Sequence, residues 1–110
     1  MSVSTHVLDS VLGRPAAGMV VQLFAVSATD GPELLGEGVT DADGRFRLAD
    51  HDTGTGAHRV VFATGAWFAG QGRETFYPTV SLDFTVVDGS AHHHVPLLLA
   101  PFAFSTYRGS

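Results

Sequence analysis

The chain has 110 residues, a formal net charge of −5 at pH 7, 45% hydrophobic residues and no cysteine. This composition predicts one folded domain, 1–110, and excludes disulfides and thiolate metal sites. The six basic residues, all arginines, form no cluster, and no apolar run approaches membrane-spanning length, so we expect neither nucleic-acid nor membrane binding.

The N-terminal half alternates strand signals with turn signals. The alternating pattern that begins at residue 4 breaks at 13–18, and an apolar run then continues to Val26, which predicts a short strand, a turn and a longer buried strand. Residues 29–38 predict a turn followed by a short strand. An Asp43-Gly44 pair between strand-like flanks predicts a β-hairpin.

The middle of the chain contains the strongest strand pattern and the only helix signal. β-Branched and aromatic residues predict a strand at 59–64, and 68–76 is the only segment that favours a helix, a short one weakened by its glycines. The segment 79–89 alternates regularly. Its apolar side chains are expected to share one face: Val80, Leu82, Phe84 and Val86.

The C-terminal segment 91–110 predicts two strands. Pro96 and Pro101 interrupt them and disfavour a central position in a sheet. Phe102 and Phe104 are expected to anchor the last strand by burial, each contributing about 2 kcal/mol. About seven or eight short strands at this spacing are typical of an antiparallel sandwich.

Strand alternation also places several polar side chains together. Residues two apart share a face, so His92 and His94 face together, and so do Arg45 and Arg47. His92 and His94 with His6 have a spacing compatible with a zinc site, although such histidine pairs often occur without metal. Each of these residues, taken alone, is more often an ordinary surface residue than a site residue.

Four longer segments together carry a resemblance to a known family. In chain order they read STHVLDSVLGRPAAG, TDADGRF, RVVFATGAWF and HHHVPLLLAPFAFSTYRGS. Over essentially the whole chain they resemble the 5-hydroxyisourate hydrolase branch of the transthyretin-like family, and the ending YRGS is the most specific piece because transthyretin lacks it. The resemblance implies an all-β, two-sheet antiparallel sandwich of about eight strands with one short helix. It also implies a homotetramer, built as a dimer of dimers.

The resemblance further implies an active site in a cleft where subunits meet. The family's catalytic residues fall on His6, Arg45, His94 and Ser110. Its substrate-binding residues fall on the same four positions and on Tyr107, Arg108 and Gly109. The implied reaction is cofactor-free and metal-free hydrolysis of 5-hydroxyisourate to 2-oxo-4-hydroxy-4-carboxy-5-ureidoimidazoline in urate degradation.

The roles implied for these residues follow their chemistry. The histidines, with Ser110, position or deprotonate water, and the arginines orient the ring and stabilise negative charge. Two other classes of function stay open: a zinc hydrolase, and a non-catalytic module that binds a small aromatic molecule as transthyretin does. The first residues show no basic segment followed by an apolar one, so the cytoplasm is the expected location.

Overall fold

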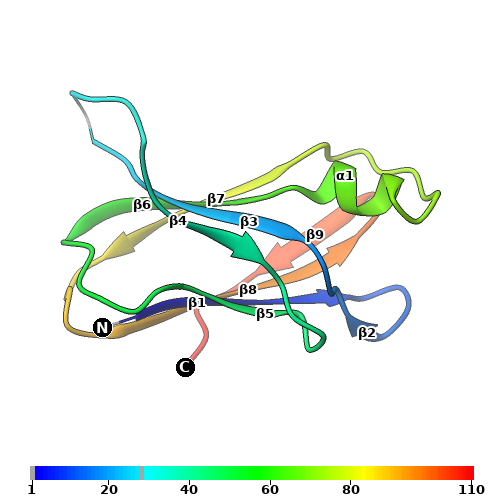
Figure 1. Cartoon of the computed structure of the whole chain (residues 1–110), viewed down its shortest axis with the longest axis horizontal. Helices are drawn as coiled ribbons and strands as arrows, with labels where there is room; N and C mark the ends of the chain where they lie inside the picture. Colours follow the sequence, from blue (N-terminus) through cyan, green and yellow to red (C-terminus); the bar gives the residue numbers. More distant parts are fainter. Residues whose placement is uncertain (1, 28) are drawn as a thin grey trace.

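Two β-sheets pack face to face, and one short helix lies at one end of them (Figure 1). The computed structural model describes residues 2–27 and 29–110. The first sheet contains β1 (Ser2–Asp9), β2 (Arg14–Pro15), β5 (Arg45–Ala49), β8 (His92–Ala100) and β9 (Ala103–Thr106). The second contains β3 (Val20–Ala25), β4 (Glu33–Val39), β6 (Gly56–Phe62) and β7 (Val80–Val86), and α1 (Thr64–Ala69) follows β6. The predicted sandwich with one short helix is confirmed.

The strand order joins the two ends of the chain. The first sheet has the order β2-β1-β8-β9 with β5 also on β1, and the second has the order β4-β3-β6-β7. β1 and β8 run parallel from the pair Ser2/His92 to the pair Asp9/Leu99, whereas every other pairing of named strands is antiparallel. A parallel pair needs a long crossover connection, and here the entire second sheet supplies it. In the described ranges, no helix has the length and apolar character needed to cross a membrane.

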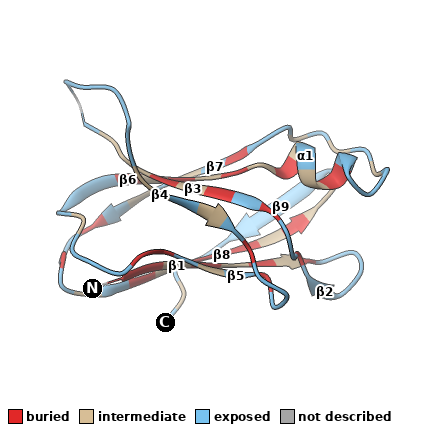
Figure 2. Ribbon diagram, viewed as in Figure 1, coloured by how far each residue is buried: buried red, intermediate tan, exposed pale blue. Residues whose placement is uncertain are grey.

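The core lies between the sheets, where strands such as β1, β6 and β7 alternate buried with more exposed residues (Figure 2). In β1 the buried side chains Val3, Thr5 and Val7 alternate with more exposed ones. The expected alternation of β7 is confirmed, since its ends Val80 and Val86 are buried. The alternate residues of β1 consequently point out of the sandwich, where the other strands of the first sheet add their own outward side chains.

The turn containing Asp43 and Gly44 is confirmed, but the expected hairpin is wrong. β4 pairs with β3 and β5 pairs with β1, so the turn passes between the two sheets. Gly44 has a φ of 75° and its carbonyl accepts the Val7 N–H at 2.7 Å. A Cβ at Gly44 would lie 2.3 Å from the Val7 carbonyl oxygen, so glycine is required both by the backbone angle and by the contact with β1.

The helix begins and ends earlier than the sequence predicts. It spans Thr64–Ala69 rather than 68–76, and the strand expected at 59–64 spans Gly56–Phe62. Phe68 is fully buried and fastens the helix to the core. The glycines of the predicted segment come after the helix, where they serve the turn that ends it.

Pro96 lies in the middle of β8, a central strand, which contradicts the expected edge position. The Pro96 carbonyl faces β9, because Thr106 Oγ1 donates to it at 2.7 Å. Within a strand the N and O of one residue point to the same side, so the missing N–H also faces β9. The β8–β9 ladder ends at the Leu97/Thr106 pair, and proline therefore costs no ladder hydrogen bond there.

The two phenylalanines of the last strand region are exposed in the single chain, so their expected burial is wrong. Phe102 is 66% exposed and Phe104 is 37% exposed. β9 is an edge strand, and Phe104 makes an edge-type contact with Tyr77, with ring centroids 5.1 Å apart. The β8–β9 ladder, rather than aromatic burial, fixes this strand in the single chain.

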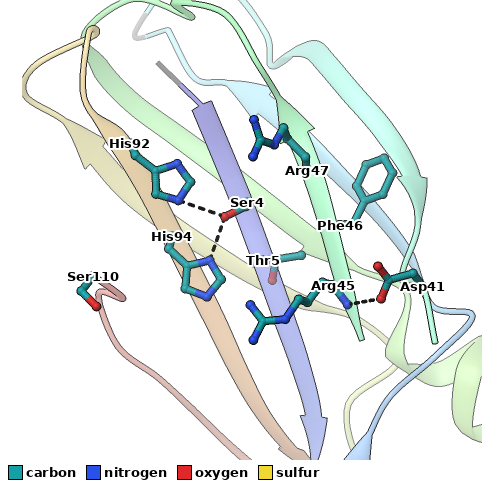
Figure 3. A pocket seen from close by; sticks show the side chains of 9 residues that line it. All are labelled: Ser4, Thr5, Asp41, Arg45, Phe46, Arg47, His92, His94 and Ser110. Carbon is teal, nitrogen blue, oxygen red and sulfur yellow. Dashed lines mark hydrogen bonds between the residues drawn. The ribbon is translucent and has the colours of Figure 1, made fainter. Parts of the chain in front are cut away.

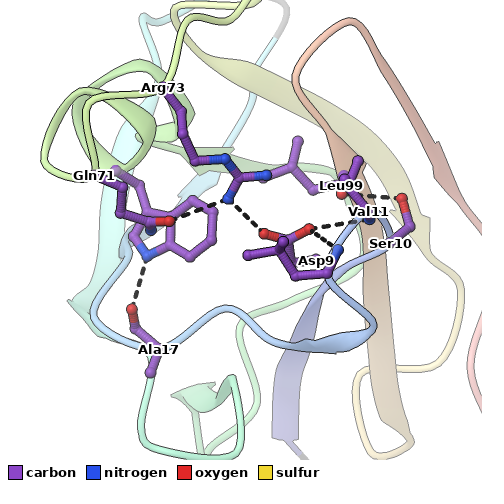
Figure 4. Close-up of polar contacts among 9 residues, drawn as sticks. Asp9, Ser10, Val11, Ala17, Gln71, Arg73 and Leu99 are labelled. Carbon is purple, nitrogen blue, oxygen red and sulfur yellow. Dashed lines mark hydrogen bonds and ion pairs between the residues drawn. The ribbon is translucent and has the colours of Figure 1, made fainter.

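A buried ion pair ties the end of β1 to the segment after α1 (Figure 4). Asp9 is 1% exposed and accepts a hydrogen bond from Arg73 Nη1 at 2.7 Å. The backbone N–H groups of Val11 and Leu12 donate to its other oxygen at 3.0 Å. Burial opposes ionisation of Asp9, but the hydrogen bond and charge of Arg73, with these backbone donors, outweigh it and lower the pKa of Asp9.

Candidate active site

A row of polar side chains lies on the outer face of the first sheet. In the strand register, Ser4 of β1 stands opposite Arg47 of β5 and His94 of β8. His6 of β1 stands opposite Arg45 of β5. Directly opposed residues share a face of the sheet, so adjacent strands gather these five residues although they are far apart in sequence.

These side chains surround a cavity of about 350 Å³. β1, β5, β8, the turn before β5 and the C-terminal residue all contribute to it (Figure 3). The lining residues are Ser4, Thr5, Asp41, Arg45, Phe46, Arg47, His92, His94 and Ser110. Of the residues expected at the site, the structure thus brings Arg45, His94 and Ser110 into one cavity.

His94 is the most constrained side chain of this cavity. Its Nδ1 is 2.8 Å from Ser4 Oγ, and its ring stacks on that of His92 with centroids 6.3 Å apart. Burial lowers the pKa of His94, and the charge of Arg45 lowers it further. The nearby imidazoles of His92 and His6 act in the same direction. His94 is therefore held in the neutral form at neutral pH, in which one ring nitrogen can accept a proton.

Arg45 is positioned by the turn that precedes it. The carboxylate of Asp41 accepts the backbone N–H groups of Asp43 and Arg45, each at 2.9 Å. Because Asp41 is engaged by backbone donors, it leaves the guanidinium group of Arg45 free (Figure 3). Among residues 2–27 and 29–110, ion pairs form at Arg59 and Arg73 but not at Arg45 or Arg47. Two uncompensated positive charges thus face the cavity, which suits an anionic ligand or developing negative charge.

The C-terminal residues leave the strand and return to β8. β9 ends at Thr106, so residues 107–110 do not continue the strand. The Gly109 N–H donates to the His94 carbonyl at 2.9 Å. A Cβ at Gly109 would lie 2.4 Å from the His94 ring, so only glycine permits this approach. The contact brings Ser110 to the cavity.

The other two residues of the C-terminal tail, residues 107–110, face away from the first cavity. Tyr107 and Arg108 line a second cavity of about 430 Å³, together with β7 residues and the buried His93. His94 lines both cavities. The tail therefore separates the two hollows in the single chain, with Ser110 facing one and Arg108 facing the other.

His6 is adjacent to the first cavity rather than part of its lining. It is half-buried in β1, directly opposite Arg45, and it lies near enough to His94 to affect the pKa of that residue. In the described parts of the chain, no group of His, Asp and Glu side chains is arranged to hold a metal ion. His92 and His94 instead share hydrogen bonds with Ser4.

Several lining residues were not singled out as site residues from the sequence. Ser4 and Arg47 had a usable signal, because each is two residues from an expected site residue in a strand. Asp41 had a weaker one, as the first residue of a turn motif. Thr5 and Phe46 had none, because their strand positions point toward the other face and only the local packing brings them to the cavity edge.

Comparison with known proteins places this geometry in a family. A model of the HIUase/Transthyretin family matches residues 3–109. The 5-hydroxyisourate hydrolase of Caulobacter vibrioides is 45% identical over 114 residues, covering 97% of this chain and 96% of that protein. The structure of Klebsiella pneumoniae 5-hydroxyisourate hydrolase matches with a TM-score of 0.86 at 40% identity, covering 100% of both chains. Sparus aurata transthyretin matches with a TM-score of 0.90 at 30% identity, covering 97% of this chain and 95% of that one.

Proposed function

This chain belongs to the HIUase/transthyretin family, and from that premise we propose that it hydrolyses 5-hydroxyisourate in urate degradation. The observation that carries the proposal is the convergence of His94, Arg45 and Ser110 on one cavity of about 350 Å³. The fold alone does not decide between hydrolase and binding protein, since transthyretin shares it. Hydrolysis needs a base that accepts a proton from water and a cation that stabilises the oxyanion. The histidine supplies the first, and the arginines beside it supply the second.

The proposed reaction opens the six-membered ring of the substrate. A water molecule loses a proton and adds to an amide-like ring carbon, which places negative charge on its oxygen. The carbon–nitrogen bond then breaks, the departing nitrogen takes up a proton, and a carboxylate remains. The product is 2-oxo-4-hydroxy-4-carboxy-5-ureidoimidazoline. The chemistry requires a base, an acid and a cation, and no metal or organic cofactor enters the proposal.

The residues are assigned by position and charge. His94 is held neutral and has Nδ1 occupied by Ser4, so Nε2 is the nitrogen that accepts the proton of water. His6 and Ser110 help to position that water, one from β1 and the other from the tail. Arg45 stabilises the oxyanion, because its guanidinium group has no carboxylate partner among the described residues.

The remaining tail residues complete the proposed substrate-binding set. Gly109 holds the tail against β8 and so places Ser110. Tyr107 and Arg108 lie across the tail from Ser110, at the second cavity. We propose that they bind substrate in the assembled protein, where neighbouring subunits bound the site.

We propose assembly as a homotetramer, a dimer of dimers. β7 and β9 end the two sheets with free edges. Large apolar side chains near these edges are exposed, namely Phe76 at 72%, Phe102 at 66% and Tyr107 at 59%. Exposed edges and apolar patches favour contact with a second copy. The cavity also opens on the outer face of the sheet, and a covering subunit would exclude bulk water and strengthen its electrostatics.

The decisive experiment follows freshly generated 5-hydroxyisourate by ultraviolet absorbance, with and without the protein. We expect decay far faster than the spontaneous reaction, in untreated protein and equally after exhaustive chelation. Activity lost on chelation and restored by zinc would replace this proposal with a zinc hydrolase. Saturable binding of a urate-like ring without any turnover would instead indicate a binding module of the transthyretin kind.

A further inference from the structure

Hydrogen bonds connect His94, Ser4 and His92 on the outer face of the first sheet (Figure 3) and continue from His92 to Ser2. Ser4 Oγ lies 2.8 Å from His94 Nδ1 and 3.3 Å from His92 Nε2. The far nitrogen of His92, Nδ1, is hydrogen bonded to Ser2 Oγ. Ser4 thus bridges two imidazoles, and the row ends at a fourth residue at the start of β1.

The donors and acceptors in this row can be matched in two arrangements. A serine hydroxyl has one proton to donate, and a neutral imidazole has one N–H and one acceptor nitrogen. In the first arrangement, His94 Nδ1–H donates to Ser4 and the Ser4 hydroxyl donates to His92, which leaves His94 Nε2 as an acceptor. In the second, His92 Nε2–H donates to Ser4 and Ser4 donates to His94 Nδ1, so His94 Nε2 bears the proton. Every bond of the row is satisfied in both arrangements.

The surroundings favour placing a positive charge on His92 rather than on His94. His94 is half-buried next to Arg45, and both features oppose a positive charge there and lower its pKa. His92 is exposed, so water solvates an imidazolium at that position. A second proton is therefore more favourable on His92 than on His94.

We propose, on the basis of the hydrolase function above, that Ser4 and His92 are positioning residues that act through His94. Ser4 sets which nitrogen of His94 faces the cavity as acceptor. As Nε2 takes the proton of water, Nδ1 gives its proton to Ser4 Oγ, and Ser4 gives its own to Nε2 of His92, which becomes an imidazolium. In the reverse sequence, Nε2 of His92 gives a proton to Ser4 and Ser4 gives its own to Nδ1 of His94, while the departing nitrogen takes the proton that His94 Nε2 holds.

Three substitutions separate these roles. Ser4→Ala breaks the bridge, Ser4→Thr keeps a hydroxyl at the same position, and His92→Gln keeps an amide that can hydrogen bond but cannot take up a proton. Ser10→Ala is the matched control, because Ser10, the residue that follows β1, also bonds to β8: its Oγ donates to the Leu99 carbonyl at 3.1 Å, away from the cavity.

The first measurement needs no substrate. Nitrogen-15 shifts of the His94 ring report which nitrogen carries the proton in the tetramer. We expect one tautomer, protonated at Nδ1, in the wild type, in Ser4→Thr and in Ser10→Ala, and a mixture or the opposite tautomer in Ser4→Ala. Unchanged shifts of His94 in Ser4→Ala would overturn the positioning role of Ser4.

The second measurement is the steady-state rate with 5-hydroxyisourate. Ser4→Ala and His92→Gln are expected to lower kcat about tenfold to a hundredfold with KM within about twofold, and Ser4→Thr is expected to restore most of the rate. Wild-type kcat in His92→Gln would overturn the relay, and equal losses in Ser10→Ala would show a merely structural effect. An inactive wild type would refute the proposed function, while the ring shifts would still decide whether Ser4 sets the tautomer.

Discussion

Arg45 and His94 show how neighbouring strands convert ordinary surface residues into a chemical site. The turn carboxylate of Asp41 fixes the backbone of Arg45, and Ser4 fixes the ring of His94. Each constraint leaves the reactive end of the side chain unoccupied. The arginine then makes the neutral imidazole more favourable, since two cations close together repel each other.

Replacing Arg45 by lysine tests its planar donor fork. Arg45 is exposed at the start of β5, so Arg45→Lys is expected to change the free energy of unfolding by no more than about 0.5 kcal/mol. Lysine offers a point charge without paired donors, so kcat/KM should fall by about tenfold or more. Denaturant titration and initial rates measure both quantities. Arg14→Lys, on exposed β2, is the control, and equal kinetics in all three proteins would return Arg45 to a surface role.

The lowered pKa of His94 predicts the acid side of the pH profile. A base must be neutral to accept a proton, so kcat/KM should stay high at pH 6.5, the usual pKa of histidine, and fall only below it. Stability is expected to change with pH in the same direction as kcat/KM. Because the folded pKa is below the unfolded one, the contribution of His94 to stability is complete above pH 6.5 and declines as pH falls toward the folded value.

Rate profiles and a nitrogen-15 titration of the His94 ring provide two independent readings of this pKa. An acid limb with its midpoint above pH 6.5 would contradict the assignment of His94 as the neutral base.

At the scale of elements, we expect the tail to serve catalysis and the segment after α1 to serve folding. The tail is mostly exposed and its backbone bridges to β8 at His94/Gly109, so we expect it to add little to stability. The segment after α1 supplies Arg73 to a buried carboxylate and so closes one end of the sandwich. Removal of the first should affect catalysis, and removal of the second should affect folding.

Deletion of residues 108–110 tests the tail. The β8–β9 ladder and the Thr106 bond to the Pro96 carbonyl both remain, so the fold should persist. The deletion removes the Gly109 contact with His94, the Ser110 hydroxyl and a guanidinium group. We expect at least about a hundredfold loss of rate, because such groups act on the transition state.

Circular dichroism and light scattering check that the truncated protein is folded and assembled. Retained activity would show that the tail lies outside the site. Unfolding or dissociation would show a structural tail, and Ser110→Ala and Arg108→Ala would then be measured singly.

Arg73→Ala tests the closure near α1. It leaves the buried Asp9 carboxylate without its cation, and we expect a loss of about 3 kcal/mol in the free energy of unfolding. The pKa of Asp9 is lowered in the native state, so its contribution to stability is present above pH 3.8 and is lost as pH falls through the folded value. Arg59→Ala, which breaks the more exposed pair with Asp83, is the control and should cost clearly less. Equal losses from the two substitutions, by denaturant titration, would contradict a special role for the buried pair.

At the scale of the molecule, the single chain leaves its cavity and the β7 and β9 edges of its sheets open. β7 and β9 carry unpaired backbone groups, and the aromatic side chains around them are exposed. The outer face of the first sheet carries the polar cavity. Exposed edges and apolar side chains of this kind favour contact with a second copy of the chain.

Assembly is accordingly expected to control activity. Multi-angle light scattering should give the mass of a tetramer at assay concentrations, and specific activity should fall on dilution into the range where the tetramer dissociates. Phe102→Glu, at the exposed β9 end and away from the cavity lining, should shift dissociation to higher concentrations. A fully active monomer would contradict a site bounded by neighbouring subunits.

The sequence by itself determined the local features of this protein. Period-two alternation assigned His92 with His94 and Arg45 with Arg47 to shared faces, and the Asp43-Gly44 pair marked a turn. These features depend only on backbone geometry within a few residues, which the local pattern records. Resemblance of longer segments added the family and the residues of the proposed site.

Tertiary structure alone decided which segments became neighbours. The parallel pairing of β1 with β8 brings Ser4 to His94 across 90 positions of sequence, and no local pattern encodes that register. The short pairing of β8 with β9 allows Pro96 into a central strand, because its missing N–H falls beyond the end of the β9 ladder. Alternation along a strand states which way a side chain points but not what lies beside it, since strand partners are chosen by the packing of the whole sandwich.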